Sequence, residues 1–171
     1  MFFSIIKKVS LKKNVKKYLS NGTTSFRGKI TTVNLLIDGI HFNETTRLIE
    51  EFVKNGIKLE NINVLVLVKD KTILDTERIT YFRPKDITLS GNVLKDKINA
   101  FIFEKSDLLV SYYQSKEINL DYIAFKSSSD FKVGFWRVDK NPNQLTINSS
   151  LVDYKLFTEE LFKYLKALNK I

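Results

Sequence analysis

The sequence predicts an α/β protein: a single doubly wound, mainly parallel sheet with helices on both faces, preceded by a basic helical arm. Three observations predict it. Apolar runs typical of buried strands alternate with stretches of helical period. The 171 residues, 43% of them hydrophobic, suffice for one core. Two prolines and six glycines are too few for long disorder. We therefore expect a Rossmann-like strand order of 3-2-1-4-5, with a further antiparallel strand at the end.

Six segments have the composition of strands. The most apolar run, 62–68, is expected at the centre of the sheet because both of its faces are hydrophobic. Residues 76–82 alternate only weakly and stop before Pro84, which is typical of an edge strand. A short, turn-rich linker joins the last two strands, which are therefore expected to form a hairpin. The expected strands are 30–38, 62–68, 76–82, 107–113, 131–138 and 144–149.

Four segments have apolar side chains at helical spacing. Asn43 is expected to cap the first helix, and Asn55-Gly56 to end it. Asp153 is expected to cap the last. Neither a linker nor an internal repeat divides this part of the chain, so we expect residues 30–171 to form a single domain. The expected helices are 43–55, 94–102, 119–127 and 153–168.

The positive charge is concentrated in residues 1–29, which we call the basic arm. The whole chain carries 28 basic and 19 acidic residues, and the basic arm holds eight of the cations and no acid. Such a segment attracts polyanions. The alternative is a solvated helix whose lysines only keep the protein soluble. The candidate polyanion-binding residues are Lys7, Lys8, Lys12, Lys13, Lys16, Lys17, Arg27 and Lys29.

The apolar residues of the basic arm do not resemble a secretory signal. Phe2, Phe3, Ile5 and Ile6 come first, and the cations Lys7 and Lys8 cut the apolar run short. No later stretch approaches the roughly 20 apolar residues that span a bilayer. We therefore expect a cytoplasmic protein, with the periphery of the inner membrane as the alternative location.

Missing residue types exclude several functional classes. Without cysteine the chain has no disulfide, Cys-ligated zinc site, iron–sulfur cluster or thiol catalyst. A single histidine excludes multi-His metal sites. The glycines never form the G-x-G-x-x-G or P-loop patterns that cradle phosphates, and G-x-S-x-G is missing too. We expect no metal and no cofactor, and nothing in the sequence requires an enzyme.

Ligands of doubly wound sheets bind beyond the carboxyl ends of the strands, where the strand order reverses. The candidate catalytic residues there are Asp38, as a base or cation holder, and His41, as a proton shuttle. The alternative is that Asp38 and Gly39 form a turn and that His41 is a loop or capping residue. The expected pocket consists of Asp38, Gly39, His41, Ser111, Tyr112 and Tyr113.

From Asp107 onward the sequence resembles a family of short, uncharacterised bacterial proteins, found mainly among the Bacteroidota, with a domain of unknown function. The resemblance implies the α/β fold and no particular activity. Gln144 stands where the family pattern has an acid. The segments that carry the resemblance are 107–113, 131–135, 145–147 and 157–171.

The segments Asp107–Val110 and Phe131–Phe135 are also similar to the N-terminal, Rossmann-like half of heptosyltransferase-like glycosyltransferases. Those enzymes need a second, nucleotide-sugar-binding domain, for which 171 residues leave no room. This similarity therefore implies a binding remnant of the half-fold.

Taken together, these features favour a non-catalytic adaptor that docks on a polyanion through the basic arm, with RNA in a ribonucleoprotein as the expected partner. The first alternative places the same arm on the anionic inner membrane surface. The second is a small enzyme or a ligand-binding half-Rossmann domain. The sequence also allows a protein partner for the basic arm, and it identifies no small-molecule ligand.

Overall fold

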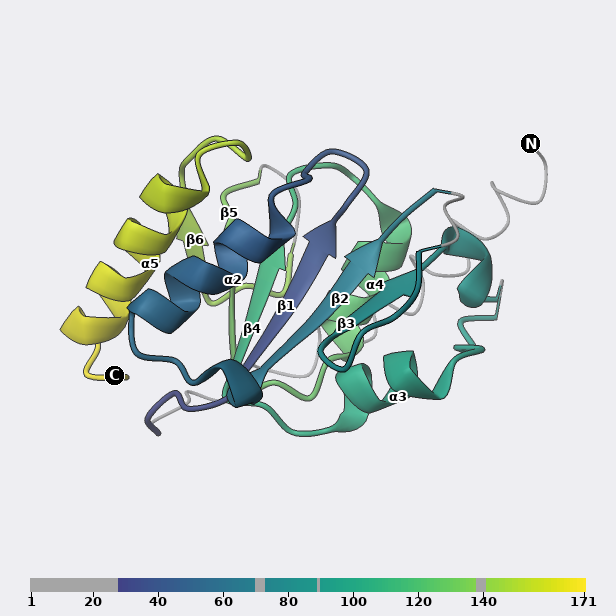
Figure 1. The fold of residues 1–171 in the computed structure, drawn as a ribbon, viewed down its shortest axis with the longest axis horizontal. Helices are drawn as coiled ribbons and strands as arrows, with labels where there is room; N and C mark the ends of the chain where they lie inside the picture. Colours follow the sequence, from purple (N-terminus) through teal and green to yellow (C-terminus); the bar gives the residue numbers. More distant parts are fainter. Residues whose placement is uncertain (1–27, 70–72, 89, 138–140) are drawn as a thin grey trace.

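The computed structural model describes residues 28–69, 73–88, 90–137 and 141–171 (Figure 1). Its six strands form one parallel sheet in the order β3-β2-β1-β4-β5-β6. This confirms the predicted doubly wound, Rossmann-like order. The strands are β1 (Val33–Asp38), β2 (Ile62–Leu67), β3 (Ile79–Phe82), β4 (Leu108–Tyr112), β5 (Phe131–Phe135) and β6 (Leu145–Ile147).

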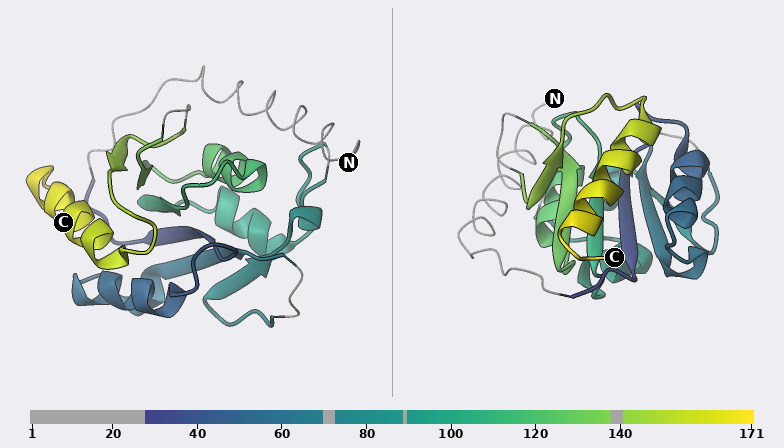
Figure 2. Two further views of the ribbon diagram at one scale, coloured as in Figure 1. Left: turned by 90° about the horizontal axis from the view of Figure 1, so that it is seen from above. Right: turned by 90° about the vertical axis from the view of Figure 1, so that its left-hand side faces the viewer.

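Within the described ranges, four α-helices cover the two faces of the sheet and give it three layers (Figures 1 and 2). Helices α2 and α5 pack on one face and α3 and α4 on the other, because successive residues of each central strand point to opposite sides. Leu35 of β1, for example, packs toward α2 and α5, whereas Leu36 packs toward α3 and α4. The helices are α2 (Thr45–Lys54), α3 (Asp96–Phe103), α4 (Ile118–Lys126) and α5 (Tyr154–Ala167).

The last strand corrects one prediction. β6 runs parallel to β5, with Val133 opposite Leu145, so the expected antiparallel hairpin is wrong. A hairpin closes with a loop of about two to five residues. β5 ends at Phe135 and β6 begins at Leu145, so the connection is longer than a hairpin loop, and the amide of Gln144 donates to the carbonyl of Lys132 at 2.7 Å.

Several element boundaries also differ from the predictions: the strands predicted at 76–82, 131–138 and 144–149 are shorter, and two further boundaries have a visible cause. The first strand begins at Val33 rather than Ile30, because the amides of Thr31 and Thr32 donate to a side chain, Asp107, instead of a neighbouring strand. Helix α2 begins at Thr45 with Glu44 at its N-cap, so the predicted Asn43 cap is wrong. At α5 the prediction is confirmed, since the carboxylate of Asp153 accepts from the amide of Leu156 at 3.1 Å.

Of the helices in the described ranges, none combines the length and the apolar character needed to cross a bilayer.

Candidate functional site

The strand order reverses between β1 and β4, and the loops that follow these two strands meet there. β1 ends at Asp38, and the loop after it leads to α2. The loop after β4 contains Ser115 and leads to α4. The side chain of Asp38 joins the two loops, because its Oδ2 accepts a hydrogen bond from the Ser115 hydroxyl at 2.7 Å. The carboxylate therefore lies at the place where doubly wound sheets bind ligands.

Asp38 is buried, with 1% of its surface exposed, and its carboxylate is already bonded within the protein. Oδ1 accepts from the backbone amide of Ile40 at 3.0 Å. Oδ2 lies 2.8 Å from Nδ1 of His41 as well as 2.7 Å from Ser115. Burial of a carboxylate is tolerated when donors surround it in this way. Asp38 thus holds its two loops together, and its oxygens do not face an open pocket.

His41 is held by this carboxylate but faces solvent. Its side chain is 59% exposed, and only Nδ1 is engaged by Asp38. The order of the three groups differs from that of a Ser–His–Asp triad, in which the imidazole stands between serine and carboxylate. Here Ser115 and His41 both bond to the same oxygen of Asp38, so His41 does not activate the serine. The geometry leaves Nε2 as the ring nitrogen of His41 that Asp38 does not engage.

The expected pocket residues in β4 and directly after it are buried in the core and do not line a pocket at this edge. Tyr112 lies in the core under α2 and α5, and its hydroxyl donates to the carbonyl of Leu151 at 2.7 Å. Tyr113 lies in the opposite core, and its hydroxyl donates to Asp121 at 3.1 Å. Burial raises the pKa of both phenols above their ordinary value. The side chain of Ser111 is also buried, with 3% of the residue exposed.

A hollow at this edge lies over the ends of β1 and β2, beside the loop that follows Asp38. We call it the β1–β2 pocket, and its volume is about 470 Å³. Gly39 forms part of its wall, where a Cβ would lie 2.5 Å from Cγ1 of Val66 and 2.8 Å from the carbonyl oxygen of Leu67. Of the six residues predicted to line a pocket, Gly39 is the one that lines it. The other lining residues include Phe42, Thr46, Val68, Lys69 and Tyr81.

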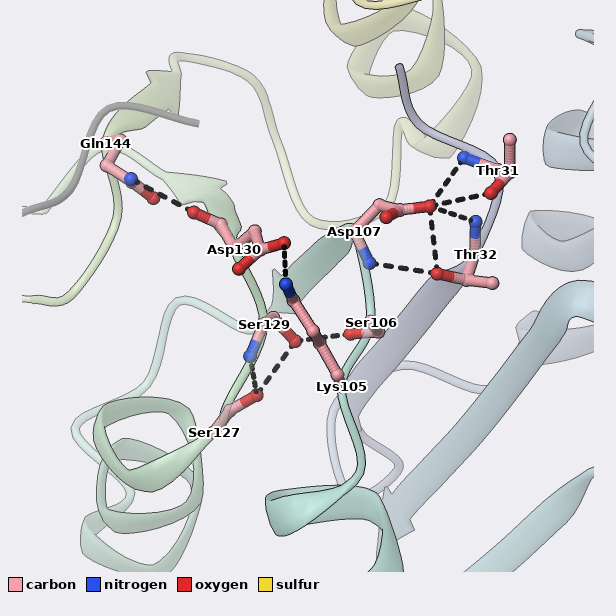
Figure 3. A network of polar contacts seen from close by, with 9 residues as sticks. All are labelled: Thr31, Thr32, Lys105, Ser106, Asp107, Ser127, Ser129, Asp130 and Gln144. Carbon is pink, nitrogen blue, oxygen red and sulfur yellow. Dashed lines mark hydrogen bonds and ion pairs between the residues drawn. The ribbon is translucent and has the colours of Figure 1, made fainter. Parts of the chain in front are cut away.

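A second polar cluster lies at the opposite, N-terminal edge of the sheet and was not predicted (Figure 3). Oδ2 of Asp107 accepts from the amides and hydroxyls of Thr31 and Thr32, all within 3.0 Å. Partial burial raises the pKa of Asp107, but these hydrogen bonds outweigh it, so the pKa is lowered. Next to Asp107, the hydroxyl of Ser129 is hydrogen-bonded to those of Ser106 and Ser127, just before β4 and β5 begin. The hydrogen-bonded residues are far apart in sequence, and no local sequence motif predicts their contact.

The candidate polyanion-binding residues lie almost entirely outside the described part of the chain, which includes only Lys29 of the eight. Its side chain is exposed, and Nζ donates to Oδ1 of Asn169 at 3.0 Å and to the carbonyl of Ile171 at 3.1 Å. The segment after it is attached as well, because the amide of Ile30 donates to the carbonyl of Lys170 at 2.7 Å. The start of the domain is thus fastened to the end of α5.

Across the described ranges, no group of three or more His, Asp or Glu side chains is arranged to hold a metal ion. Asp38 and His41 form a pair, and Ser115 completes the cluster with a neutral hydroxyl.

These features define a doubly wound α/β domain of Rossmann-like strand order, with a pocket at the carboxyl edge and a basic arm before its first strand. Residues 7–168 match the family of unknown function DUF6913, and the chain belongs to that family. The match spans most of the basic arm as well as the domain. Neither a curated protein nor a solved structure matches the chain. The similarity to heptosyltransferase-like enzymes therefore stays a prediction.

Proposed function

We propose that this protein is a non-catalytic adaptor of the bacterial cytoplasm that docks on RNA, within a ribonucleoprotein, through its basic arm. The observation that carries the proposal is the distribution of charge. Eight cations and no acid stand in residues 1–29, whereas residues 30–171 hold 20 cations and 19 acids. A polyanion is attracted by such a segment through its phosphates, without any reading of sequence.

The ion pairs of the domain support this distribution. Many of its cations lie within 4.0 Å of an acid of the same domain, which lowers the net field around it. Asp86, for example, pairs with both Arg83 and Lys95, at 3.6 and 3.3 Å. The other pairs are Arg47–Glu44, Lys54–Glu51, Lys97–Asp75, Lys105–Asp130, Arg137–Asp121 and Lys163–Glu160.

The attachment of residues 29–32 suits an adaptor. Lys29 and Ile30 are bonded to the segment after α5, and Thr31 and Thr32 to Asp107. The basic arm would therefore join the domain at a fixed point on the N-terminal edge of the sheet.

The test is the salt dependence of binding to a single-stranded oligouridylate. If about six cations neutralise phosphates, the logarithm of the association constant falls against the logarithm of salt concentration with a slope of about −4 to −5. Neutralising six arm lysines to Gln should remove most of this slope. The matched control neutralises six exposed lysines of the domain, which should leave the slope nearly unchanged. The arm set is Lys7, Lys8, Lys12, Lys13, Lys16 and Lys17, and the domain set is Lys58, Lys85, Lys105, Lys155, Lys163 and Lys166.

A slope near zero, or equal losses in the two variants, would overturn the proposal. Flotation with vesicles containing phosphatidylglycerol tests the membrane alternative. Arm-dependent flotation that survives nuclease treatment, together with no measurable binding to the oligouridylate, would place the basic arm on lipid and contradict the RNA proposal.

A further inference from the structure

The β1–β2 pocket has the dimensions and the lining of a small-molecule site. Its volume of about 470 Å³ falls within the range of roughly 300–1,000 Å³ that is usual for ligand pockets. It opens at the carboxyl ends of β1 and β2, next to the position where the strand order reverses. The proposed RNA docking through the basic arm makes no use of it.

The loop after β1 uses several of its backbone amides within the protein. In dinucleotide-binding domains, free backbone amides of this loop face the pyrophosphate. Here three successive amides point back to Asp38. The amide of Ile40 donates to its carboxylate at 3.0 Å. Those of His41 and Phe42 donate to its carbonyl oxygen at 3.3 and 3.0 Å. These three amides therefore make no contact with a ligand, and side chains of the lining are the groups that can.

The side chains around the pocket are divided by chemistry. The wall formed by the strands is apolar and contains Val66, Val68 and Ile79, with the ring of Tyr81 beside them. The loop after β1 and the first turn of α2 add the polar side chains of Asn43, Thr45 and Thr46 beside the apolar Ile40 and Phe42. A ligand that fits this lining has a compact apolar body and a polar end.

The charge of the lining determines the sign of that polar end. Lys69 is the cation among the described lining residues, and none of them is an aspartate or glutamate. An ammonium group together with two hydroxyls and an amide can bind one carboxylate or phosphate group. Asp38 does not line the pocket, and its carboxylate is bonded to Ser115 and His41.

We infer that the β1–β2 pocket binds a small organic acid with one anionic group, a carboxylate or a phosphate monoester, on a compact apolar body. The anionic group lies toward Lys69 and the threonines, and the apolar body lies on Val66 and Val68. The inference favours such an acid over dinucleotides and nucleoside diphosphates, because the amides of Ile40, His41 and Phe42 donate to Asp38 and do not face a diphosphate.

The experiment titrates the isotopically labelled full-length protein with 1-naphthyl phosphate and, separately, 1-naphthoate, and follows the backbone amide signals by NMR. Either anion should shift the amides of Gly39, Thr45, Thr46 and Lys69. The uncharged analogue 1-naphthol and ADP should bind at least about fivefold more weakly. Whichever of the two anions binds more tightly identifies the source of the charge, a carboxylate or a phosphate.

Two variants test the residues of the pocket. Lys69→Gln should weaken binding of the better anion about five- to tenfold, as expected for one charge-assisted contact. Lys155→Gln, which removes an exposed lysine of α5, should leave it unchanged. A well-dispersed spectrum of each variant shows that the fold is retained.

Three results would overturn the inference. The first is that 1-naphthol binds as tightly as the two anions. The second is that the shifted amides lie in the basic arm rather than around the pocket. The third is that Lys69→Gln and Lys155→Gln behave alike.

Discussion

Asp107 and Thr32 bond to each other in both directions. Oδ2 of Asp107 accepts from the amide and the hydroxyl of Thr32 at 2.8 and 3.0 Å, and the amide of Asp107 donates to that hydroxyl at 2.9 Å. These residues stand just before β4 and β1, the two neighbouring strands at the centre of the sheet. The exchange therefore fixes the N-terminal ends of both strands and, with them, the point where the basic arm joins the domain.

We predict that Asp107→Asn destabilises the protein by about 2–4 kcal/mol at neutral pH. The substitution removes the charge that four donors face, and it can bring a donor amide against them. Asp130→Asn serves as the control, because the Asp130 carboxylate pairs with the largely exposed Lys105. Such a pair contributes about 0–1 kcal/mol. Chemical denaturation measures both values, and equal losses would contradict the prediction.

The penalty of Asp107→Asn should also depend on pH. The folded-state pKa of Asp107 lies below its ordinary value of 3.8, so its contribution is fully present above pH 3.8. As the pH falls through 3.8 toward the lowered folded-state pKa, the unfolded form binds a proton that the folded form does not yet bind. Through this group the wild type therefore loses stability in this range, whereas Asp107→Asn does not. The stability difference between the two proteins should therefore shrink in acid, and a constant difference would refute the assigned role.

The order of the strands could be predicted from the sequence because it rests on local patterns. Residues 62–68 are apolar on both faces and contain β2, which has a neighbouring strand on each side. The weakly alternating residues 76–82 contain the edge strand β3. The direction of β6 could not be predicted in this way. A linker rich in turn residues suits a hairpin and a return loop equally, and the pairing of Val133 with Leu145 decides between them.

The candidate site was harder to predict from the sequence than the fold. Asp38 was selected because it ends a strand, but its burial depends on Ser115, a residue 77 positions away that carried no signal. Tyr112 and Tyr113 follow one another, so a strand must send them to opposite faces and into two different cores. Lys69 lies one residue beyond the hydrophobic run, and only the three-dimensional arrangement places it at the pocket.

We predict that Gly39→Ala costs about 1–3 kcal/mol, because the added methyl group must displace the side chain of Val66 and the backbone carbonyl of Leu67. Gly56→Ala provides the comparison. A Cβ at Gly56 meets no neighbour, but its φ of +96° is unfavourable for alanine, which costs about 1 kcal/mol. The free energies of unfolding in urea measure both. A loss below about 0.5 kcal/mol at Gly39 would show that the wall of the pocket is not tightly packed.

We predict that Ser115→Ala destabilises the protein by about 1–3 kcal/mol. The substitution removes the hydroxyl that donates to the buried Asp38 carboxylate at 2.7 Å and leaves that oxygen with His41 as its remaining side-chain partner. Ser128→Ala, at an exposed position, should cost less than about 0.5 kcal/mol. Thermal unfolding compares the two variants. Equal midpoints would mean that the Ser115–Asp38 bond does not hold the two loops together.

The final prediction concerns Lys132, whose ammonium group reaches under α4. Nζ donates to the carbonyls of Ala124 and Phe125 at 2.9 and 3.4 Å, and burial lowers the pKa of Lys132 to about 8. In the unfolded chain this lysine keeps its proton up to its ordinary pKa of 10.5. Between these two values the unfolded state binds more protons than the folded state, so this group makes stability rise with pH.

The measurement is the difference in unfolding free energy between the wild type and Lys132→Met, which keeps the apolar stem and removes the charge. The difference should be constant below pH 8, should change in favour of the wild type between about 8 and 10.5, and should level off above. Tyr112 and Tyr113, whose raised pKa values lower stability in alkali, are present in both proteins and cancel. Lys155→Met should show no such change, because Lys155 is exposed. A difference for Lys132→Met that stays flat across this range would mean that the ammonium group remains charged beneath α4.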